Sequence, residues 1–317
     1  MKREQAIDVA KGICILLMFI GHCNGFHPLL YKGIESFHMP FFFIAAGFFY
    51  RPKANREVVW SSFKRLIIPL ILGVIVCSLI WLFFGYAEQA KHIAESILFP
   101  GGTRSKVLFW PGRTDSGVFW FLAALFWSRV LYNLIYQRWK KYVLWICVGI
   151  GCAFVVISRR FMLPLCLNEG CVGLLFYAIG HIAKEKGIQN YKPVWWMIVV
   201  FLTIWLVDIH FVSFQMFKVG FDMFFPIGVV FACGMSFLTY RFATHVKGKK
   251  TKYMLAWVGM YGIECMFAHE CVLTVMRCLH KTGMGWHYDI ETIGILLCSI
   301  MGAWLIVKVK NLLKINR

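Results

Sequence analysis

The sequence predicts an all-α membrane protein that crosses the bilayer about ten times, and three observations support this prediction. Of the 317 residues, 60% are hydrophobic and only 15% are charged, whereas soluble domains carry about 25% charged residues. The apolar residues fall in runs long enough for transmembrane helices, which need roughly 17–25 residues. The connections are short, so we expect residues 1–317 to form a single integral membrane domain. This composition excludes a soluble enzyme and a disordered chain.

The first half of the chain contributes five of the expected spans. The first, 6–24, follows Met1, Lys2 and Arg3 in the manner of a signal peptide. It lacks a small-residue cleavage site, however, and a further span follows at once, so we expect a retained helix. The others are 35–50, which is short, then 66–87, 117–136 and 142–158. The connection 88–116 is expected to hold a short amphipathic helix, from Ala90 to Phe99, and then a Gly- and Pro-rich stretch.

The second half contributes the remaining five spans. They are 170–183, again short, then 194–212, 219–240, 254–276 and 290–309. An even number of crossings places both ends of the chain on the same side of the membrane. About two thirds of the 34 Lys and Arg residues then fall on that side, which the positive-inside rule assigns to the cytoplasm. Membrane topology thereby explains the net charge of +19, without nucleic acid as a partner.

The twelve Cys residues lie mostly within apolar segments, where they behave as small hydrophobic residues. Cys166 and Cys171 flank a loop expected on the outside, and we expect two free thiols there rather than a disulfide. Neither a CxxC motif nor a Cys/His spacing indicates a metal site, so none is expected.

Ionisable residues inside the first span are the first candidates for function, because such groups are expensive within a bilayer. Lys11 and His22 are eleven positions apart. On an α-helix this spacing puts them within about 20° of one face but roughly 16 Å apart along the axis. They cannot touch each other, but a long anionic molecule could contact both. The simpler alternative is that Lys11 extends to lipid headgroups and His22 only ends the helix.

Further polar residues are expected at the same outer depth as His22. Glu35 and His38 are three residues apart and can pair on one helix face. Glu264 and His269 lie in the ninth span, and Arg129 lies well inside the fourth. Each residue alone is more often a satisfied structural group, but three His with carboxylates at similar depth favour a functional cavity.

Four segments resemble the acyltransferase-three family of integral membrane acyltransferases, in particular its fucose 4-O-acetylase-like branch. They are IDVAKGICILLMFIGH (Ile7 to His22), FHMPFFFIAAGFFY (Phe37 to Tyr50), FWFLAALFWSRVLY (Phe119 to Tyr132) and WVGMYGIECMFAHE (Trp257 to Glu270). They occur in the family's order, and Glu264 and His269 fill the family's Glu and His places. The middle helices are recognisable only as hydrophobic.

The resemblance implies about ten helices in a bacterial inner membrane. It also implies transfer of an acyl group, usually acetyl, from cytoplasmic acyl-CoA to a hydroxyl of an extracytoplasmic sugar or glycan. The coenzyme phosphates are then expected near Lys11, with Arg65 or Arg129, and the thioester near His22. His22 is expected to act as a general base or to be acylated transiently. The residues expected to orient the sugar and tune His22 are Glu35, His38, Glu264 and His269.

The chain departs from the family pattern at three positions. Lys11 stands where the broader family has Arg, which keeps the charge but binds phosphate less well in a bidentate manner. Ala46 and Gly262 stand where Ser is usual, which puts a hydroxyl role at those places in doubt.

Other functions are compatible with the same residues. A transporter or flippase for a glycan or lipid-linked sugar would also place polar residues in its spans, although the sequence has no internal repeat typical of that class. A structural scaffold and a haem or quinone protein are further alternatives. The identity of the acceptor sugar, the choice between acetyl and succinyl, and the oligomeric state are left open by the sequence.

Overall fold

The computed structural model describes residues 5–23, 28–98, 116–158, 160–191, 195–207, 216, 225–284 and 288–313. These residues are helical and contain no strand, as the sequence predicts. The helices are α1 (Gln5–Gly21), α2 (Pro28–Glu35), α3 (His38–Phe48), α4 (Asn55–Ser62), α5 (Ile68–Phe83), α6 (Ala87–Glu95), α7 (Trp120–Trp139), α8 (Val143–Ile157), α9 (Leu167–Glu185), α10 (Trp195–Val207), α11 (Phe225–His245), α12 (Lys249–Met260), α13 (Gly262–Lys281) and α14 (Tyr288–Leu312). Five short π or 3-10 segments, η1 (Phe63–Ile67) and η2 (Gly117–Phe119) among them, connect or extend these helices.

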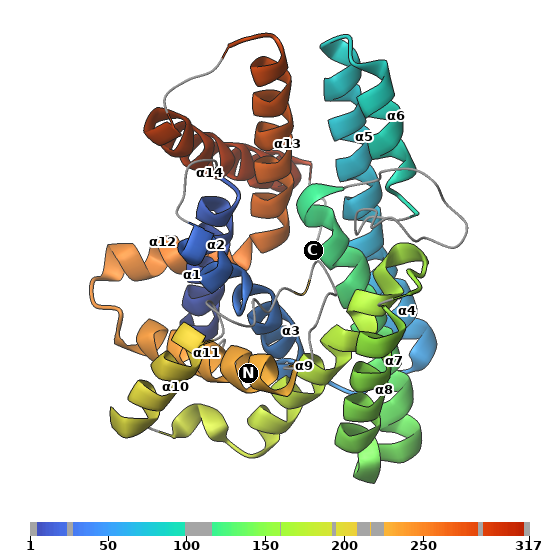
Figure 1. Ribbon diagram of the computed structural model, residues 1–317, viewed down its shortest axis with the longest axis vertical. Helices are drawn as coiled ribbons and strands as arrows, with labels where there is room; N and C mark the ends of the chain where they lie inside the picture. Colours follow the sequence, from blue (N-terminus) through green and yellow to red (C-terminus); the bar gives the residue numbers. More distant parts are fainter. Residues whose placement is uncertain are drawn as a thin grey trace.

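Five helical segments among the described residues are long and apolar enough to cross a membrane, and the chain is therefore a membrane protein. They are Asn55–Phe83, Gly117–Ile157, Pro164–Glu185, Phe225–His245 and Ile290–Leu312. The second of them folds back at Trp139, whose backbone leaves helical geometry, so it contains both α7 and α8, which lie side by side (Figure 1). The count of ten spans remains a prediction, and parts of the expected spans 6–24, 194–212 and 219–240 lie outside the described residues.

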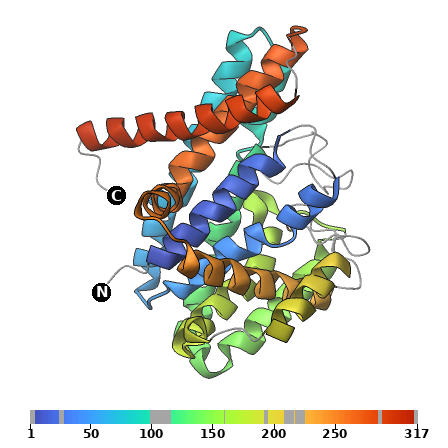
Figure 2. The same cartoon turned by 90° about the vertical axis from the view of Figure 1, so that its left-hand side faces the viewer.

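Two of the expected spans are divided in the structure. The span 35–50 is split between α2 and α3, because the chain turns at Ser36 and Phe37 just before Pro40. Proline lacks a backbone N–H and clashes with the carbonyl four residues earlier, so a continuous helix through this point is unfavourable. The span 254–276 is split at Tyr261, where φ is −103° and ψ is 35°, and α13 leaves in a new direction while α12 is seen nearly end-on in Figure 2.

The amphipathic helix in the first long connection is present but begins earlier than expected. It is α6, Ala87–Glu95, and Phe99 lies outside the described residues. Figure 1 shows α6 beside α5 and α13 at one end of the molecule, with α7 and α8 toward the other end. Figure 2 shows that the start of α1 and the end of α14 lie on the same side.

Two pairs of glycines bring helices into backbone contact. A Cβ on Gly12 of α1 would lie 2.0 Å from the carbonyl oxygen of Leu255, and one on Gly259 of α12 would lie 1.9 Å from that of Asp8. The same reciprocal arrangement joins α3 and α9 through Gly47 and Gly180. Small residues at such crossings allow close van der Waals packing, which drives helix association in membranes. These crossings hold α1 and α3, the two helices that carry His22 and His38.

Candidate active site

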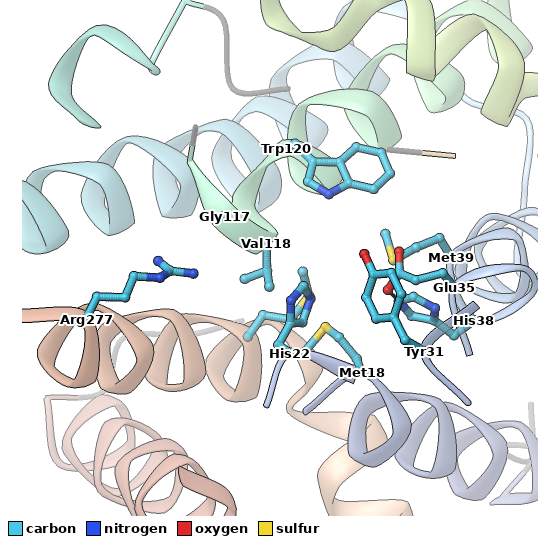
Figure 3. A pocket seen from close by; sticks show the side chains of 11 residues that line it. Met18, His22, Tyr31, Glu35, His38, Met39, Gly117, Val118, Trp120 and Arg277 are labelled. Atoms are coloured by element: carbon cyan, nitrogen blue, oxygen red, sulfur yellow. Dashed lines mark ion pairs between the residues drawn. The ribbon is translucent and has the colours of Figure 1, made fainter. Parts of the chain in front are cut away.

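A cavity of about 170 Å³ lies where α1, α2, α3, α13 and the η2–α7 segment meet. It is lined by Met18, His22, Tyr31, Glu35, His38, Met39, Gly117, Val118, Trp120, Met266 and Arg277. Figure 3 shows His22 in the middle, with Arg277 on one side of it and Tyr31, Glu35 and His38 on the other. The structure thus brings together three of the five residues that the sequence predicts as catalytic.

His22 lies in the turn that ends α1. Its backbone N–H donates to the carbonyl of Met18 at 3.1 Å, so the helical geometry continues up to this residue. Its side chain is half-buried and lines the cavity. The ring of His269 on α13 lies behind it, with ring centroids 5.8 Å apart.

Glu35 and His38 form the second part of the site, on either side of the α2–α3 turn. Nδ1 of His38 lies 2.8 Å from the carbonyl oxygen of Ile34, and since a carbonyl can only accept, Nδ1 carries the proton of the neutral ring. Nε2 lies 3.7 Å from Oε1 of Glu35. That oxygen is buried without a hydrogen-bond partner among the described residues. Glu35 therefore presents an unsatisfied acceptor oxygen at the cavity wall, where a substrate hydroxyl would satisfy it.

His269 is fully buried and held from two sides. Phe19 stacks on its ring at 4.2 Å, with 17° between the ring planes. Nδ1 lies 3.1 Å from the hydroxyl oxygen of Ser299 on α14. Nε2 has no hydrogen-bond partner among the described residues. His269 is therefore a partner of His22 rather than a lining residue of the cavity.

A carboxylate that the sequence analysis did not assign, Glu270, connects α13 to the start of α7. It accepts from the backbone N–H of Val118 at 3.1 Å and from Nη1 of Arg277 at 2.7 Å. Gly117 has φ +56°, and a Cβ there would lie 2.0 Å from Oε2 of Glu270, so only glycine fits this position. Arg277, with its side chain 47% exposed, is thereby held at the edge of the cavity.

Glu264 lies away from the cavity. It is in the first turn of α13, and its Oε1 accepts from Nζ of Lys310 on α14 at 3.1 Å. The break at Tyr261 places Glu264 at the beginning of a new helix instead of in the middle of a long one. Glu264 is not among the residues that line the cavity, and its part in orienting the sugar stays a prediction.

The three predicted donor-binding cations also lie outside the cavity. Lys11 pairs with Asp8, with 2.8 Å between Nζ and Oδ1. Arg65 is exposed on the π-helical segment η1, and Arg129 is half-buried on α7 within electrostatic reach of Arg65 and Tyr177. Cys166 and Cys171 form no disulfide with each other, as expected.

Several site residues escaped the sequence analysis because they approach from distant segments. Tyr31, Trp120 and Arg277 line the cavity, and Ser299 contacts His269. Only Gly117 carries a local signal, as a glycine in a Gly- and Pro-rich connection, and that signal indicates a turn rather than a site.

Comparison with known proteins supports the resemblance seen in the sequence. A family model described as an acyltransferase domain matches residues 4–309. The nodulation protein NolL of Mesorhizobium japonicum is 25% identical over 225 residues, which cover 64% of this chain and 54% of that protein. NolL of Sinorhizobium fredii is 27% identical over 187 residues, covering 55% and 49%. The chain thus spans about half the length of these relatives, and no solved structure matches it.

Proposed function

The chain belongs to the acyltransferase domain family, and on this premise we propose that it is a membrane O-acyltransferase acting on carbohydrate. In this proposal an acyl group, acetyl in the first instance, moves from cytoplasmic acyl-CoA to a hydroxyl of an extracytoplasmic sugar or polysaccharide. The observation that supports it most strongly is the cavity in which His22 lies between Arg277 and the Glu35–His38 pair. Both chain termini would face the cytoplasm of a bacterial inner membrane.

The acceptor sugar would bind at the wall formed by Tyr31, Glu35 and His38. The unsatisfied oxygen of Glu35 accepts a hydrogen bond from one sugar hydroxyl. Trp120 on the opposite wall offers an aromatic face for the sugar ring. Arg277 donates to oxygen atoms at the other end of the cavity, with its guanidinium held by Glu270. These contacts would place one hydroxyl beside His22.

His22 would then act as the general base. As the acceptor oxygen attacks the thioester carbonyl, His22 takes the hydroxyl proton. The C–S bond breaks, and the proton passes from His22 to the departing coenzyme A thiolate. In the alternative sequence, the acyl group is first carried on the His22 ring and the hydroxyl attacks that intermediate. Each sequence yields one acylated sugar and one free thiol.

The donor would extend along α1. Lys11 lies roughly 16 Å before His22 along the axis, so the two residues suit the two ends of an extended pantetheine arm. Lys11, together with Arg65 and Arg129, would bind the coenzyme phosphates, and His22 would meet the thioester. This arrangement gives a reason for a cation and a His on one face that are too far apart to interact.

The test uses inverted membrane vesicles that contain the protein and its host's glycans. Radiolabelled acetyl-CoA is added outside, where the cytoplasmic face is accessible, and the label on glycan is measured. We expect labelled glycan with the wild-type protein and none with His22→Ala. His245→Ala, which changes an exposed His at the end of α11, is the matched control and should retain labelling.

A transporter would behave differently in this experiment. Glycan would then cross the membrane while the label stayed on coenzyme A, both with the wild-type protein and with His22→Ala. That result would replace the enzyme proposal with the transport function.

A further inference from the structure

Ser299 on α14 makes two hydrogen bonds that together determine the proton position on His269. The side chain is fully buried. Its Oγ lies 2.6 Å from the backbone carbonyl oxygen of Ile295 and 3.1 Å from Nδ1 of His269. A hydroxyl has one proton to donate, whereas its oxygen can accept from other groups.

The carbonyl of Ile295 can only accept, so the Ser299 proton is directed to it. Oγ is then available to His269 only as an acceptor, and Nδ1 of His269 must carry the ring proton. Nε2 is then an unprotonated acceptor, and it is buried without a hydrogen-bond partner among the described residues.

The rings next to His269 are those of Phe19 and of His22, the proposed base. Phe19 stacks on the ring and fixes its plane. One turn later on α1, His22 lies with its ring centroid 5.8 Å from that of His269, tilted by 51°. A hydrogen bond between the two rings would require the His22 side chain to rotate toward His269. His22 and Arg277 are the titratable side chains whose charges act most strongly on His269.

We propose that Ser299 is a positioning residue that fixes His269 as the Nδ1–H tautomer, so that its Nε2 accepts an N–H hydrogen bond from His22 during the reaction. This inference rests on the proposed function, in which His22 is the base. A His22 ring that donates through one nitrogen has its other nitrogen unprotonated and turned to the cavity. When that nitrogen takes the acceptor's proton, Nε2 of His269 stabilises the resulting imidazolium until the proton leaves on the coenzyme A thiolate.

The first test reads the tautomer directly and does not depend on activity. The protein, labelled with ¹⁵N-histidine and purified in detergent, is studied by long-range ¹H–¹⁵N NMR, with the His269 signals identified by their loss in His269→Gln. We expect the Nδ1–H pattern in the wild-type protein and in Ser299→Thr, which retains the hydroxyl. In Ser299→Ala we expect the Nε2–H pattern or a mixture of both, because Nδ1–H has lost its acceptor.

The matched control is Ser236→Ala on α11. Ser236 is buried and makes the same bond to the carbonyl four residues earlier, Oγ to Ala232 at 2.6 Å, but it contacts no His ring in the described part of the chain. This variant should leave the His269 signals unchanged, which separates the tautomer effect from the loss of a buried helix hydroxyl.

The second test measures acyl transfer in the vesicles described above. Ser299→Ala should lower kcat at least tenfold with little change in KM for acyl-CoA, while Ser299→Thr and Ser236→Ala stay near the wild-type rate. An Nδ1–H pattern that persists in Ser299→Ala would overturn the inference, whatever the activity. If the tautomer changes but kcat does not, the link from His269 to His22 is wrong. If the wild-type protein transfers no acyl group, the proposed function fails while the tautomer result still stands.

Discussion

Two regions of this protein bury histidines, and they differ in what faces the second ring nitrogen. Where α3, α7 and α9 meet, Nδ1 of His181 bonds the hydroxyl of Tyr132 at 2.6 Å, and Nε2 lies 3.7 Å from Oε1 of Glu185. The rings of Tyr50 and Tyr136 pack around it, with centroids 4.8 and 5.2 Å away. At the cavity, by contrast, His269 and Glu35 keep buried atoms without a partner among the described residues.

In the proposed enzyme, this contrast is one between polar groups that stabilise the fold and polar groups that serve the reaction. A buried polar network in which every atom is satisfied gives rigidity. Buried atoms left unsatisfied are unfavourable unless something else satisfies them. In the proposed enzyme, the substrate would satisfy Oε1 of Glu35, and His22 would satisfy Nε2 of His269. The tyrosine cluster around His181 is therefore expected to affect stability, and the cavity is expected to affect acyl transfer.

The largest expected effect is that of removing the base. His22→Ala should lower acyl transfer by about 10²–10⁴-fold, the usual contribution of a positioned general base. The measurement is the rate of label transfer from acetyl-CoA to glycan. The melting temperature in detergent should stay near that of the wild-type protein, because the side chain is only half-buried. A variant that keeps full transfer would show that the cavity His residues are not catalytic.

A smaller effect is expected at the unsatisfied carboxylate. Glu35→Gln keeps the shape of the side chain but removes its charge and replaces one acceptor oxygen with a donor. We expect roughly a tenfold rise in the KM for the acceptor, equivalent to about 1.4 kcal/mol, with the KM for acyl-CoA unchanged. Glu264→Gln, which alters a carboxylate paired with Lys310 outside the cavity, is the control. If Glu264→Gln raised the KM for the acceptor as much as Glu35→Gln does, a special role of Glu35 in acceptor binding would be contradicted.

A still smaller effect is expected at the donor end. The ammonium of Lys11 is partly exposed and already paired with Asp8, so its contribution to phosphate binding should be about 0.5–1 kcal/mol. Lys11→Ala should raise the KM for acyl-CoA a few-fold and leave that for the acceptor unchanged. A raised KM for the acceptor with an unchanged KM for acyl-CoA would contradict the placement of the donor along α1. Lys11→Arg, which keeps the positive charge, should show the wild-type KM for acyl-CoA.

The smallest effect on activity is expected in the tyrosine cluster. Asn133 accepts from the Tyr50 hydroxyl at 2.9 Å and donates to the carbonyl of Lys53 at 2.9 Å and to Oδ1 of Asn55 at 2.7 Å. Asn133→Ala removes this partner of the Tyr50 hydroxyl and of Oδ1 of Asn55, while the carbonyl of Lys53 still accepts from Nε2 of Gln137. It should destabilise the protein by about 1–3 kcal/mol. The observable is a lower melting temperature with kcat within twofold of wild type. A large loss of kcat in a folded variant would mean that this region also serves the reaction.

The sequence predicts the parts of the site that depend on local spacing. The apolar run from Ile7 to His22 places a cation and a His at the two ends of one helix, and the three-residue spacing of Glu35 and His38 predicts their pairing, although the helix breaks between them. Family membership, expected from four short motifs, is confirmed by the match to residues 4–309.

Contacts between distant segments could not be predicted in the same way. Ser299 meets His269 from thirty residues away, and Val118 meets Glu270 from 152 residues away. No periodic pattern encodes such contacts, because they depend on how helices cross. The helix break at Tyr261 is missed for a related reason. The run 254–276 is mostly apolar on both sides of Tyr261. An apolar run indicates burial in lipid or protein but does not indicate the direction of the chain.

The glycine crossing of α1 with α12 has a consequence for the size of the molecules that the protein can use. The α1 helix itself fixes the distance from Lys11 to His22, and the contact of Gly12 with α12 beside Lys11 fixes where the Lys11 end of α1 lies. In the proposed enzyme, the distance from Lys11 to His22 suits the pantetheine arm, which every acyl-CoA shares. This distance therefore cannot distinguish one acyl chain from another. Selection among acyl groups then falls to Met18, Met39 and Met266 at the His22 end, whose flexible side chains can adjust to fit a different group.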